Sequence, residues 1–347
     1  MRVLVTGGCG LIGFNAAKYY HEQGHEVTVM DNLERSALLG HDEVGAKRQV
    51  FNRGKLIEMG VSVLPYDVSD QGSFAALQGH EVILHFAGQC GVPPSIENPR
   101  RDFEINAIGT FNVLEYARRH DSIVAYASTN KVYPIHGGFV KKGDRWGFES
   151  PEWDRYGVPV ANDLVGARTP YGTSKYTGDL LCQEYAHTYG LRTGVFRMSC
   201  IYGPGQFGFS EQGWATWFLI ARMKGLPLTI YGDGDQVRDM LYVDDCVKAY
   251  DAFIQQCTIR SGVWNLGGGP DNTLTLHEHL KLMDEFLPKY SVNPPPVTYK
   301  DWRPLDQKAY VTDIRPIYRD LGWKPGAGPA EGLARTAAWV EANLEIF

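Results

Sequence analysis

Paired cysteines and long hydrophobic runs are both missing from this sequence. Its six cysteines are scattered through 347 residues and none belongs to a C-x-x-C pair, which argues against a zinc site or another metal centre and against a disulfide framework. We interpret them as buried thiols in a reducing cytosol. No apolar stretch approaches about 18 residues, and a strand-like segment begins within the first residues, so no signal peptide is expected. We therefore expect a cytoplasmic protein that neither crosses nor binds a membrane.

An excess of basic residues is missing as well. The chain has 34 Lys and Arg against 40 Asp and Glu, which gives a formal net charge of -6 and a pI near 5.9. Such a chain has no general attraction to nucleic acid, so any anion site must be local. The 44% of hydrophobic residues is typical of a globular protein, and the length predicts about two domains at roughly 150 residues each.

The first third of the chain alternates short β-branched runs with longer helical patterns. Strands are expected at residues 3–6, 26–30, 61–64, 81–86 and 123–127, and helices at 11–23 and 107–119. This alternation is typical of βαβ units. We therefore predict an α/β fold with a Rossmann-type, doubly wound parallel sheet.

The rest of the chain is more mixed. Residues 134–169 are rich in Gly, Pro, Trp and charge without a sustained period, so we expect a long irregular insertion near the site. Further elements are expected as a helix at 171–189, strands at 192–196, 228–231 and 263–266, and helices at 276–287 and 329–344. The loop-rich part after residue 200 is expected to cap a substrate.

A glycine-rich turn lies between the first strand and the first helix. Residues 6–13 read TGGCGLIG. Gly7, Gly10 and Gly13 suit a tight turn, a close approach of the backbone to a pyrophosphate, and close packing of helix on strand. The helix N-terminus then offers free N–H groups to the phosphates. The sequence predicts a dinucleotide site here.

Acidic residues follow the next two strands. Asp31 lies 18 residues beyond Gly13, where a carboxylate accepts hydrogen bonds from the ribose hydroxyls of the adenosine and repels a 2′-phosphate. NAD is therefore favoured over NADP, although the nearby Arg35 could accommodate a phosphate. Asp67, which precedes Val68, could hold the adenine amino group, or it could simply cap the end of a strand.

A phenol, an ammonium and a hydroxyl form the candidate catalytic set. Tyr171 and Lys175 stand at i and i+4 of one predicted helix, and Ser128 and Thr129 follow an apolar strand. A tyrosine with its usual pKa of about 10 needs a drop of roughly three units to act as a base near pH 7. A cation at about 4 Å is worth roughly that much, so Lys175 is expected to ionise Tyr171. Thr129 would hold the reacting sugar oxygen.

These motifs together resemble the extended short-chain dehydrogenases/reductases, the NAD-dependent epimerases and dehydratases that act on nucleotide sugars. The resemblance rests on residues 6–13, 31–33 and 85–89, Asn106, residues 128–129, Tyr171 with Lys175, and residues 238–239. It covers nearly the whole chain. It implies an NAD-binding domain over residues 1–200, and a nucleotide-sugar-binding lobe over 201–347 from which some segments return to the first domain.

Within this family, several segments are similar to the CDP-paratose 2-epimerase branch, also called CDP-tyvelose epimerases. They are residues 128–133, 206–207, 212–214, 217–218 and 234–239. This similarity implies that bound NAD+ removes and returns hydride at C2 of a CDP-, UDP- or GDP-hexose during polysaccharide biosynthesis. Dehydratases carry an Asp-Glu pair where this chain has Asn130 and Lys131, which argues against dehydration. A 4-epimerase or 4-reductase, or a non-catalytic dinucleotide-binding protein, remain alternatives.

The resemblance also assigns individual residues. Contacts to NAD are implied for Gly7, Gly10, Leu11, Ile12, Asp31, Asn32, Arg35, Asp67, Val68, Phe86, Ala87, Gly88, Gln89, Asn106, Ser128, Tyr171, Lys175 and Met198. Contacts to the substrate are implied for Gln89, Ser95, Thr129, Asn130, Ser199, Gln206, Gln212, Arg238, Arg303 and Asp306.

The chemistry of the side chains supports two of these assignments. Guanidinium groups suit the oxygens of a diphosphate, so Arg238 and Arg303 are expected there. The alternative is an ion pair with Asp239 or Asp306. Trp214 and Trp217, three residues apart, are expected to pack a helix core. The family commonly dimerises through the two long helices at 107–119 and 171–189, which implies a homodimer or homotetramer.

Overall fold

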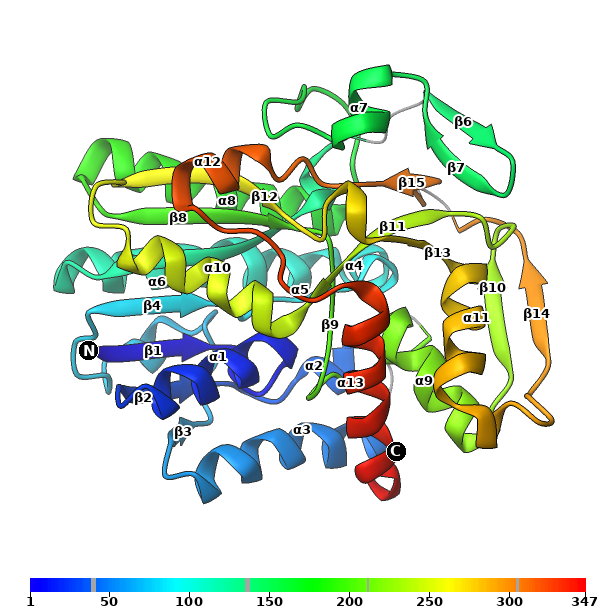
Figure 1. Cartoon of the computed structure of the whole chain (residues 1–347). Helices are drawn as coiled ribbons and strands as arrows, with labels where there is room; N and C mark the ends of the chain where they lie inside the picture. The colour runs from blue at the N-terminus through cyan, green and yellow to red at the C-terminus, as the bar shows by residue number, and fades with distance from the viewer. Residues whose placement is uncertain (39–41, 135–137, 211, 304–305) are drawn as a thin grey trace.

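A seven-stranded parallel sheet runs through the molecule in the order β12-β8-β5-β4-β1-β2-β3 (Figure 1). The computed structural model describes residues 1–38, 42–134, 138–210, 212–303 and 306–347. The strands are β1 (Arg2–Thr6), β2 (Glu26–Met30), β3 (Ser62–Leu64), β4 (Val82–His85), β5 (Ile123–Thr129), β8 (Thr193–Met198) and β12 (Ser261–Leu266). Strand order reverses between β1 and β4, which places the carboxyl ends of both strands at one crevice.

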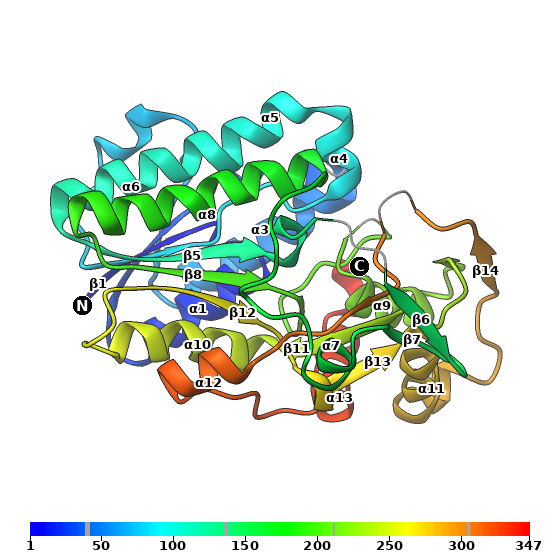
Figure 2. The ribbon, with the colours of Figure 1, turned by 90° about the horizontal axis from the view of Figure 1, so that it is seen from above.

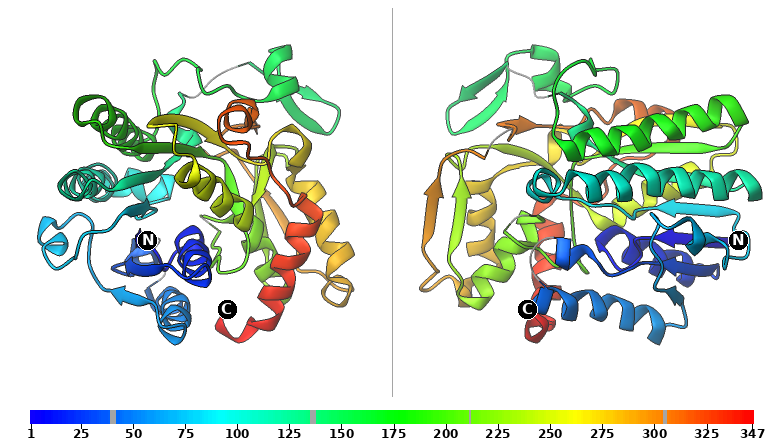
Figure 3. Two further views of the ribbon diagram at one scale, coloured as in Figure 1. Left: turned by 60° about the vertical axis from the view of Figure 1, so that its left-hand side comes forward. Right: turned by 180° about the vertical axis from the view of Figure 1, so that it is seen from behind.

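Helices cover both faces of this sheet, which Figure 2 shows from above and Figure 3 shows from the side and from behind. One face carries α1 (Leu11–Glu22), α3 (Asp42–Glu58), α10 (Val243–Gln255) and α12 (Arg315–Leu321). The other carries α5 (Pro99–Phe103), α6 (Gly109–His120) and α8 (Pro170–Tyr189), with a π-helical turn at Glu104–Ile108 between α5 and α6. The short helices α2 (Arg35–Leu38) and α4 (Val92–Glu97) lie on connecting segments. The predicted doubly wound parallel sheet is thus confirmed.

A second group of elements lies beyond the carboxyl ends of these strands, at the right of Figure 1. It contains the strands β9 (Cys200–Tyr202), β11 (Val237–Tyr242), β13 (Thr273–Thr275) and β15 (Ala309–Tyr310), and the parallel pair β10 (Leu228–Tyr231) and β14 (Val297–Lys300). The helices are α9 (Trp214–Lys224), α11 (Leu276–Phe286) and α13 (Pro329–Ala342). Buried side chains such as Leu219, Ile220 and Leu333 give this lobe a core of its own. The later chain also returns to the large sheet, where β12 pairs with β8.

The expectation of an irregular insertion is wrong for its middle part. The strands β6 (Phe139–Lys142) and β7 (Arg145–Phe148) form an antiparallel hairpin, and α7 (Pro151–Tyr156) follows. Gly143 provides the positive φ of the turn, +64°, and the Ser150 hydroxyl accepts a hydrogen bond from the backbone N–H of Trp153 to cap α7. Each element is too short for its period to stand out in the sequence. Residues 135–137 of the insertion lie outside the described residues.

The cysteines are all unpaired, but they are not uniformly buried. Cys9, Cys182 and Cys246 are buried, Cys90 and Cys200 are half-buried, and Cys257 is exposed. The interpretation of six buried thiols is therefore wrong for the last three.

Within the described ranges, no His, Cys, Asp or Glu groups are arranged to hold a metal ion. No helix in that same part of the chain is long and apolar enough to span a bilayer.

Candidate active site

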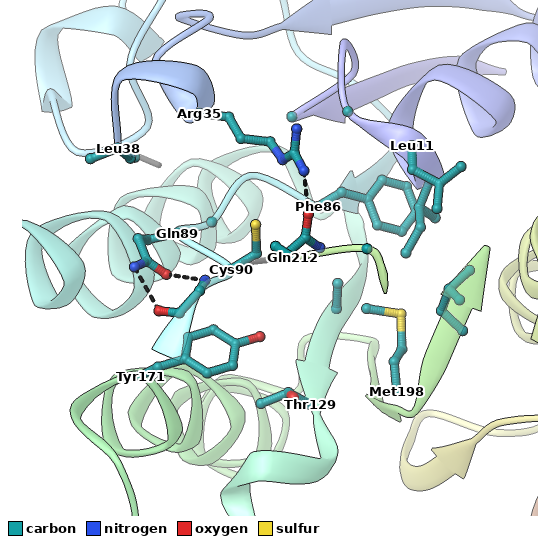
Figure 4. Close-up of a pocket in the computed structure, with 18 of the residues that line it drawn as sticks. Leu11, Arg35, Leu38, Phe86, Gln89, Cys90, Thr129, Tyr171, Met198 and Gln212 are labelled. Carbon is teal, nitrogen blue, oxygen red and sulfur yellow. Dashed lines mark hydrogen bonds between the residues drawn. The ribbon is translucent and has the colours of Figure 1, made fainter. Parts of the chain in front are cut away.

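One cavity of about 720 Å³ opens at the carboxyl ends of β1, β4, β5 and β8 (Figure 4). It brings together nearly all of the predicted site residues, from both ends of the chain. Those that line it are Gly7, Gly10, Leu11, Ile12, Asp31, Asn32, Arg35, Asp67, Val68, Phe86, Ala87, Gly88, Gln89, Ser128, Thr129, Asn130, Tyr171, Lys175, Met198, Ser199, Gln206, Gln212, Arg238, Arg303 and Asp306.

The glycine turn after β1 has the geometry of a phosphate cradle. A Cβ at Gly7 (φ +68°) would lie 2.6 Å from the backbone nitrogen of Ala87, and one at Gly13 would lie 2.2 Å from the Gly7 oxygen. A Cβ at Gly10 would meet only the Gly7 oxygen within 4 Å, at 3.3 Å, and would otherwise project into the cavity. The first hydrogen bond of α1 runs from Phe14 N to Gly10 O (2.9 Å), so the N–H groups ahead of it have no acceptor within the helix. This turn fits the pyrophosphate of a dinucleotide.

Backbone hydrogen bonds hold the Asp31 carboxylate at the end of β2. Cys9 N donates to Oδ2 and Leu33 N donates to Oδ1, both at 2.8 Å. Burial raises the pKa of Asp31, and the two backbone bonds oppose that rise. The charge of Arg35 also lowers the pKa of Asp31, but the Arg35 guanidinium hydrogen-bonds Gln212 and the Phe207 carbonyl oxygen (3.3 Å). The arginine that could have accommodated a 2′-phosphate is thus occupied, as Figure 4 shows for its bond to Gln212.

The predicted adenine contact, Asp67, belongs to a charged cluster that the sequence did not reveal. Arg101 Nη2 lies 2.6 Å from Asp67 Oδ2 and also pairs with Glu34. Ser69 donates to Asp67 Oδ1 through its backbone N–H (2.8 Å) and its hydroxyl (2.7 Å), so Asp67 does cap the turn after β3. Burial raises the pKa of Asp67, but the bonds from Arg101 and Ser69 outweigh it and the pKa is lowered. Asp67 therefore faces the cavity as a carboxylate.

The catalytic candidates lie where β5 ends and α8 begins. Thr169 caps α8 by accepting a hydrogen bond from Gly172 N (3.0 Å), which puts Tyr171 in the first turn. Thr129 is the last residue of β5 and hydrogen-bonds the Tyr171 phenol. Its Oγ1 also accepts from Lys131 N (3.2 Å) and donates to Asn130 Oδ1 at 3.5 Å, a long bond that a substrate oxygen could replace. Figure 4 shows the side chains of Tyr171 and Thr129 on the same side of the cavity.

The expected ionisation of Tyr171 rests on Lys175 together with oxidised nicotinamide, and Lys175 by itself does not produce it in the structure. Burial raises the pKa of Tyr171 above its usual value, and the bond from Thr129 lowers it only in part. Burial also lowers the pKa of Lys175 to about 8, and its Nζ lies 4.4 Å from the centroid of the Tyr126 ring. Desolvation disfavours a buried phenolate more than this ammonium favours it. A phenolate here needs positive charge beyond that of Lys175.

The far end of the cavity carries cations. Arg238 Nη2 lies 2.9 Å from Asp306 Oδ1, which makes Asp306, rather than Asp239, its ion-pair partner. Asp239 is fully buried and accepts from Ser199 Oγ, Gly269 N (3.1 Å) and Thr312 N (3.2 Å). The same end is lined by Arg303, whose guanidinium carbon lies 4.1 Å from the centroid of the Tyr231 ring, by Lys131, and by Ser199.

Three residues that line the cavity were not singled out as ligands from the sequence. The Lys131 ammonium donates to Gln307 Oε1 (2.9 Å), and burial lowers its pKa to about 8. Trp214 and Trp217 do pack in the core of the lobe, as expected, but they also line the cavity. Their three-residue spacing indicated a helix and could not tell which side faces a ligand. Lys131 could have been found from its place two residues after Thr129.

Some predicted contacts have their polar groups engaged within the protein. Ser95 and Asn106 are not among the lining residues: the Ser95 hydroxyl donates to Val92 O (2.7 Å), and Asn106 is 1% exposed. The Gln89 amide bonds Gly91 at both its oxygen (2.7 Å) and its nitrogen (2.8 Å). Of these three residues only Gln89 lines the cavity, and a ligand would have to compete with Gly91 for its amide.

Comparison with known proteins finds relatives that match this chain over nearly its whole length. A model of the NAD dependent epimerase/dehydratase family matches residues 3–267. The CDP-paratose 2-epimerase of Salmonella typhi is 32% identical over 366 residues, with 98% of this chain and 99% of that protein covered. The UDP-glucose 4-epimerase of Thermotoga maritima with UDP-glucose has a TM-score of 0.77 at 28% identity, covering 99% and 100% of the two chains. The UDP-glucose 4-epimerase of Thermus thermophilus in complex with NAD has a TM-score of 0.75 at 28% identity, covering 98% and 99%.

Proposed function

The chain belongs to the NAD dependent epimerase/dehydratase family, and from that membership we propose that it is a nucleotide-sugar epimerase. Its cofactor is NAD. The reaction we propose is inversion at C2 of a hexose carried on a nucleoside diphosphate, with CDP-paratose or CDP-tyvelose, or a related CDP-, UDP- or GDP-hexose, as substrate. The similarity to the CDP-paratose 2-epimerase supports this choice of carbon and base.

The continuity of the cavity carries the proposal. A single space joins the glycine cradle at Gly10 to the cationic end at Arg238, and Tyr171 and Thr129 line it with them. A dinucleotide in the cradle and a sugar diphosphate at the cations would meet near these two hydroxyls. A protein that only bound a dinucleotide would need neither the cationic end nor a phenol in the cavity wall.

The chain's own residues move the proton in the proposed reaction. Bound NAD+ supplies a hydride acceptor that can give the hydride back, and its positive charge favours the phenolate. Tyr171 takes the proton of the sugar hydroxyl and returns it after the ketone has turned its other face. Thr129 donates its hydrogen bond to the reacting oxygen in place of its long bond to Asn130 Oδ1 (3.5 Å).

The residues after Thr129 argue against dehydration. Elimination of water needs an acid and a base beside the sugar, and the resemblance puts Asn130 and Lys131 at the positions that hold them in dehydratases. Asn130 has no proton to exchange near neutral pH. Lys131 is held by Gln307 at the cationic end (2.9 Å). The oxidation and return of hydride then proceed without loss of a hydroxyl group.

We also propose that two copies associate through α6 and α8 and that the enzyme acts in the cytoplasm, in polysaccharide biosynthesis. The two helices pack side by side on one face of the sheet (Figure 2). Large apolar side chains stay exposed there: Phe111 is 41%, Leu180 47% and Tyr189 54% exposed. A cluster of this kind on two adjacent helices is typical of a protein interface. An isologous pairing of these helices would bury it.

The test follows a deuterium label through turnover. Purified protein with NAD+ is incubated with CDP-paratose, CDP-tyvelose or UDP-glucose deuterated at C2, and the product is followed by NMR. We expect an inverted C2 that keeps its deuterium. Tyr171→Phe, as a control, should keep NAD and lose at least about 100-fold in turnover, because the transferring phenol is gone. Inversion or exchange at C4 would support a 4-epimerase or 4-reductase instead, and NAD binding without any turnover would support a non-catalytic protein.

A further inference from the structure

A buried carboxylate that the proposed reaction does not use lies behind the catalytic helix. Asp102 of α5 is 1% exposed, and the described residues offer it no ion-pair partner. Its Oδ2 accepts from the Ser174 hydroxyl and its Oδ1 accepts from Asn106 Nδ2 (3.2 Å). Burying a carboxylate without a bonded cation is costly. Such a group calls for a compensating charge nearby.

That charge is the ammonium of Lys175. Ser174, which donates to Asp102, directly precedes Lys175 on α8. A Cβ placed on Gly88 would lie 2.9 Å from Asn106 Oδ1 and 3.5 Å from Lys175 Nζ, so the amide and the ammonium both border the same small space. Asp102 is therefore connected to Lys175 in two ways. One is its hydrogen bond with Ser174, the neighbour of Lys175 on α8, and the other is its hydrogen bond with the Asn106 amide.

The Asn106 amide is oriented by its donors. Its Nδ2 group donates toward Gln89 O (3.2 Å), Asp102 Oδ1 (3.2 Å) and Ser174 Oγ (3.0 Å). Its Oδ1 is therefore turned to the opposite side, toward Gly88, where it is buried and has no hydrogen-bond partner among the described residues. An unpartnered acceptor beside a buried ammonium is a favourable arrangement, because the oxygen carries negative partial charge.

Among the described groups around Lys175, Asp102 is the carboxylate whose negative charge is not already paired with another cation. Asp179, one turn further along α8, is already paired with Arg197 through two bonds (2.9 and 3.2 Å). The remaining titratable groups that face Lys175 are Tyr171 and Cys182 of α8, Cys90 after β4, His85 of β4 and Tyr126 of β5. His85 is fully buried, and burial keeps its pKa near 3, so it is neutral near pH 7. Tyr126, Tyr171 and Cys182 are neutral there as well, because burial raises their pKa values.

We propose that Asp102 is a positioning residue that keeps Lys175 charged and, through the Asn106 amide, held beside Gly88. The proposal deepens the proposed function, since it concerns the ammonium that assists Tyr171. Asp102 touches neither substrate nor cofactor, and it does not line the cavity. Its effect is carried by its charge and by the hydrogen bonds it accepts.

The direction of the electrostatic effect follows from the charges. Burial lowers the pKa of Lys175 to about 8, and the negative charge of Asp102 opposes that fall. In return, burial raises the pKa of Asp102, while the Ser174 bond and the Lys175 charge lower it. Removing the carboxylate charge must therefore lower the pKa of Lys175 further. The ammonium would then be lost at a lower pH.

The test measures the charge of Lys175 directly, without relying on turnover. The NAD-loaded protein is acetylated by a trace of acetic anhydride at several pH values, and the label on Lys175 is quantified by mass spectrometry. Asp102→Asn keeps the shape of the side chain and removes its charge. We expect the titration of Lys175 to move down by roughly one pH unit, the scale on which one charge acts across several ångströms in a protein. Ser174→Ala removes a hydrogen bond to Asp102 and leaves its charge in place, so it should move the Lys175 titration much less.

Turnover provides the second readout and the controls. If the wild type epimerises a nucleotide sugar, the alkaline fall of its kcat should shift with the Lys175 titration in Asp102→Asn. Asp121→Asn makes the same chemical change at an exposed left-handed position that Asn tolerates, and both readouts should stay unchanged. An unshifted Lys175 titration in both Asp102→Asn and Ser174→Ala would overturn the proposal. A wild type without turnover would instead count against the proposed function, and the acetylation result would still decide the role of Asp102.

Discussion

The buried ion pair between Arg197 and Asp179 gives the sharpest stability prediction. Arg197 Nε lies 2.9 Å from Asp179 Oδ2 and Nη2 lies 3.2 Å from Oδ1, with side chains 4% and 0% exposed. The Ser128 hydroxyl donates to the same carboxylate (2.9 Å), beside Thr129. The pair thus joins α8 and β8 to the end of β5. The perturbation is Arg197→Met, which keeps the apolar stem and removes the charge.

The expected cost follows from the burial of the partner that stays behind. Removing one member of a buried pair leaves an uncompensated charge and typically costs about 3–5 kcal/mol of the free energy of unfolding. For a chain of 347 residues, the entropy of unfolding is about 0.7 kcal/mol/K. The midpoint of thermal unfolding should therefore fall by roughly 4–7 °C. Combining Arg197→Met with Asp179→Asn removes the unpaired carboxylate charge as well. The double variant should therefore be about 2 kcal/mol more stable than the sum of the two single losses predicts.

Chemical unfolding followed by tryptophan fluorescence, with calorimetry alongside, measures these differences. Arg260→Met is the matched control, because Arg260 is exposed and only its guanidinium edge bonds the Gly190 carbonyl (3.4 Å). That variant should stay within about 0.5 kcal/mol of the wild type. A loss below about 1 kcal/mol in Arg197→Met, or strict additivity with Asp179→Asn, would refute the idea that the pair is electrostatically coupled.

Three further predictions concern binding and assembly. Gly13→Ala should abolish NAD retention, because the added Cβ would lie 2.2 Å from the Gly7 oxygen. The assay measures the nucleotide released when the protein is denatured. Gly54→Ala is the control and should retain NAD, because its Cβ would have no atom within 4 Å. Since Lys131 loses its proton above its lowered pKa of about 8, the Kd for CDP or UDP by calorimetry should rise about tenfold from pH 7 to pH 9. Lys131→Met should bind weakly at both pH values, and an unchanged pH dependence in this variant would assign the titration elsewhere. Phe111→Glu should convert the oligomer to a monomer in light scattering, and a mass unchanged by the substitution would exclude the α6 and α8 surface.

Local patterns allowed much of the nucleotide-binding half to be predicted. The strands predicted at 3–6 and 26–30 are β1 and β2 to within a residue, and the helix predicted at 171–189 is α8. The glycine turn and the Tyr171 to Lys175 spacing were readable because a turn and one helical face depend on residues close together in the chain. The helix α10 escaped prediction although its apolar residues recur at helical spacing, since it follows β11 directly, with no loop between them.

Contacts between distant segments were not readable in the same way. Arg101 meets Asp67 across 34 positions and Lys131 meets Gln307 across 176, and nothing in the local sequence couples these residues. The hairpin in the insertion was missed because its strands are only four residues long. The raised pKa of Tyr171 depends on burial, which the packing of the lobe over the sheet creates.

The sequence by itself determined the fold class, and it singled out the glycine turn and the candidate catalytic hydroxyls, because each is encoded in residues a few positions apart. Only the tertiary structure decided which charges meet and how far they are removed from water. It gave Arg238 the partner Asp306 in place of Asp239, and it set Asp102 behind Lys175. The energy of a charge interaction depends on the distance between the groups and on the local dielectric constant. Folding sets both, and neither can be inferred from how far apart the groups are along the chain.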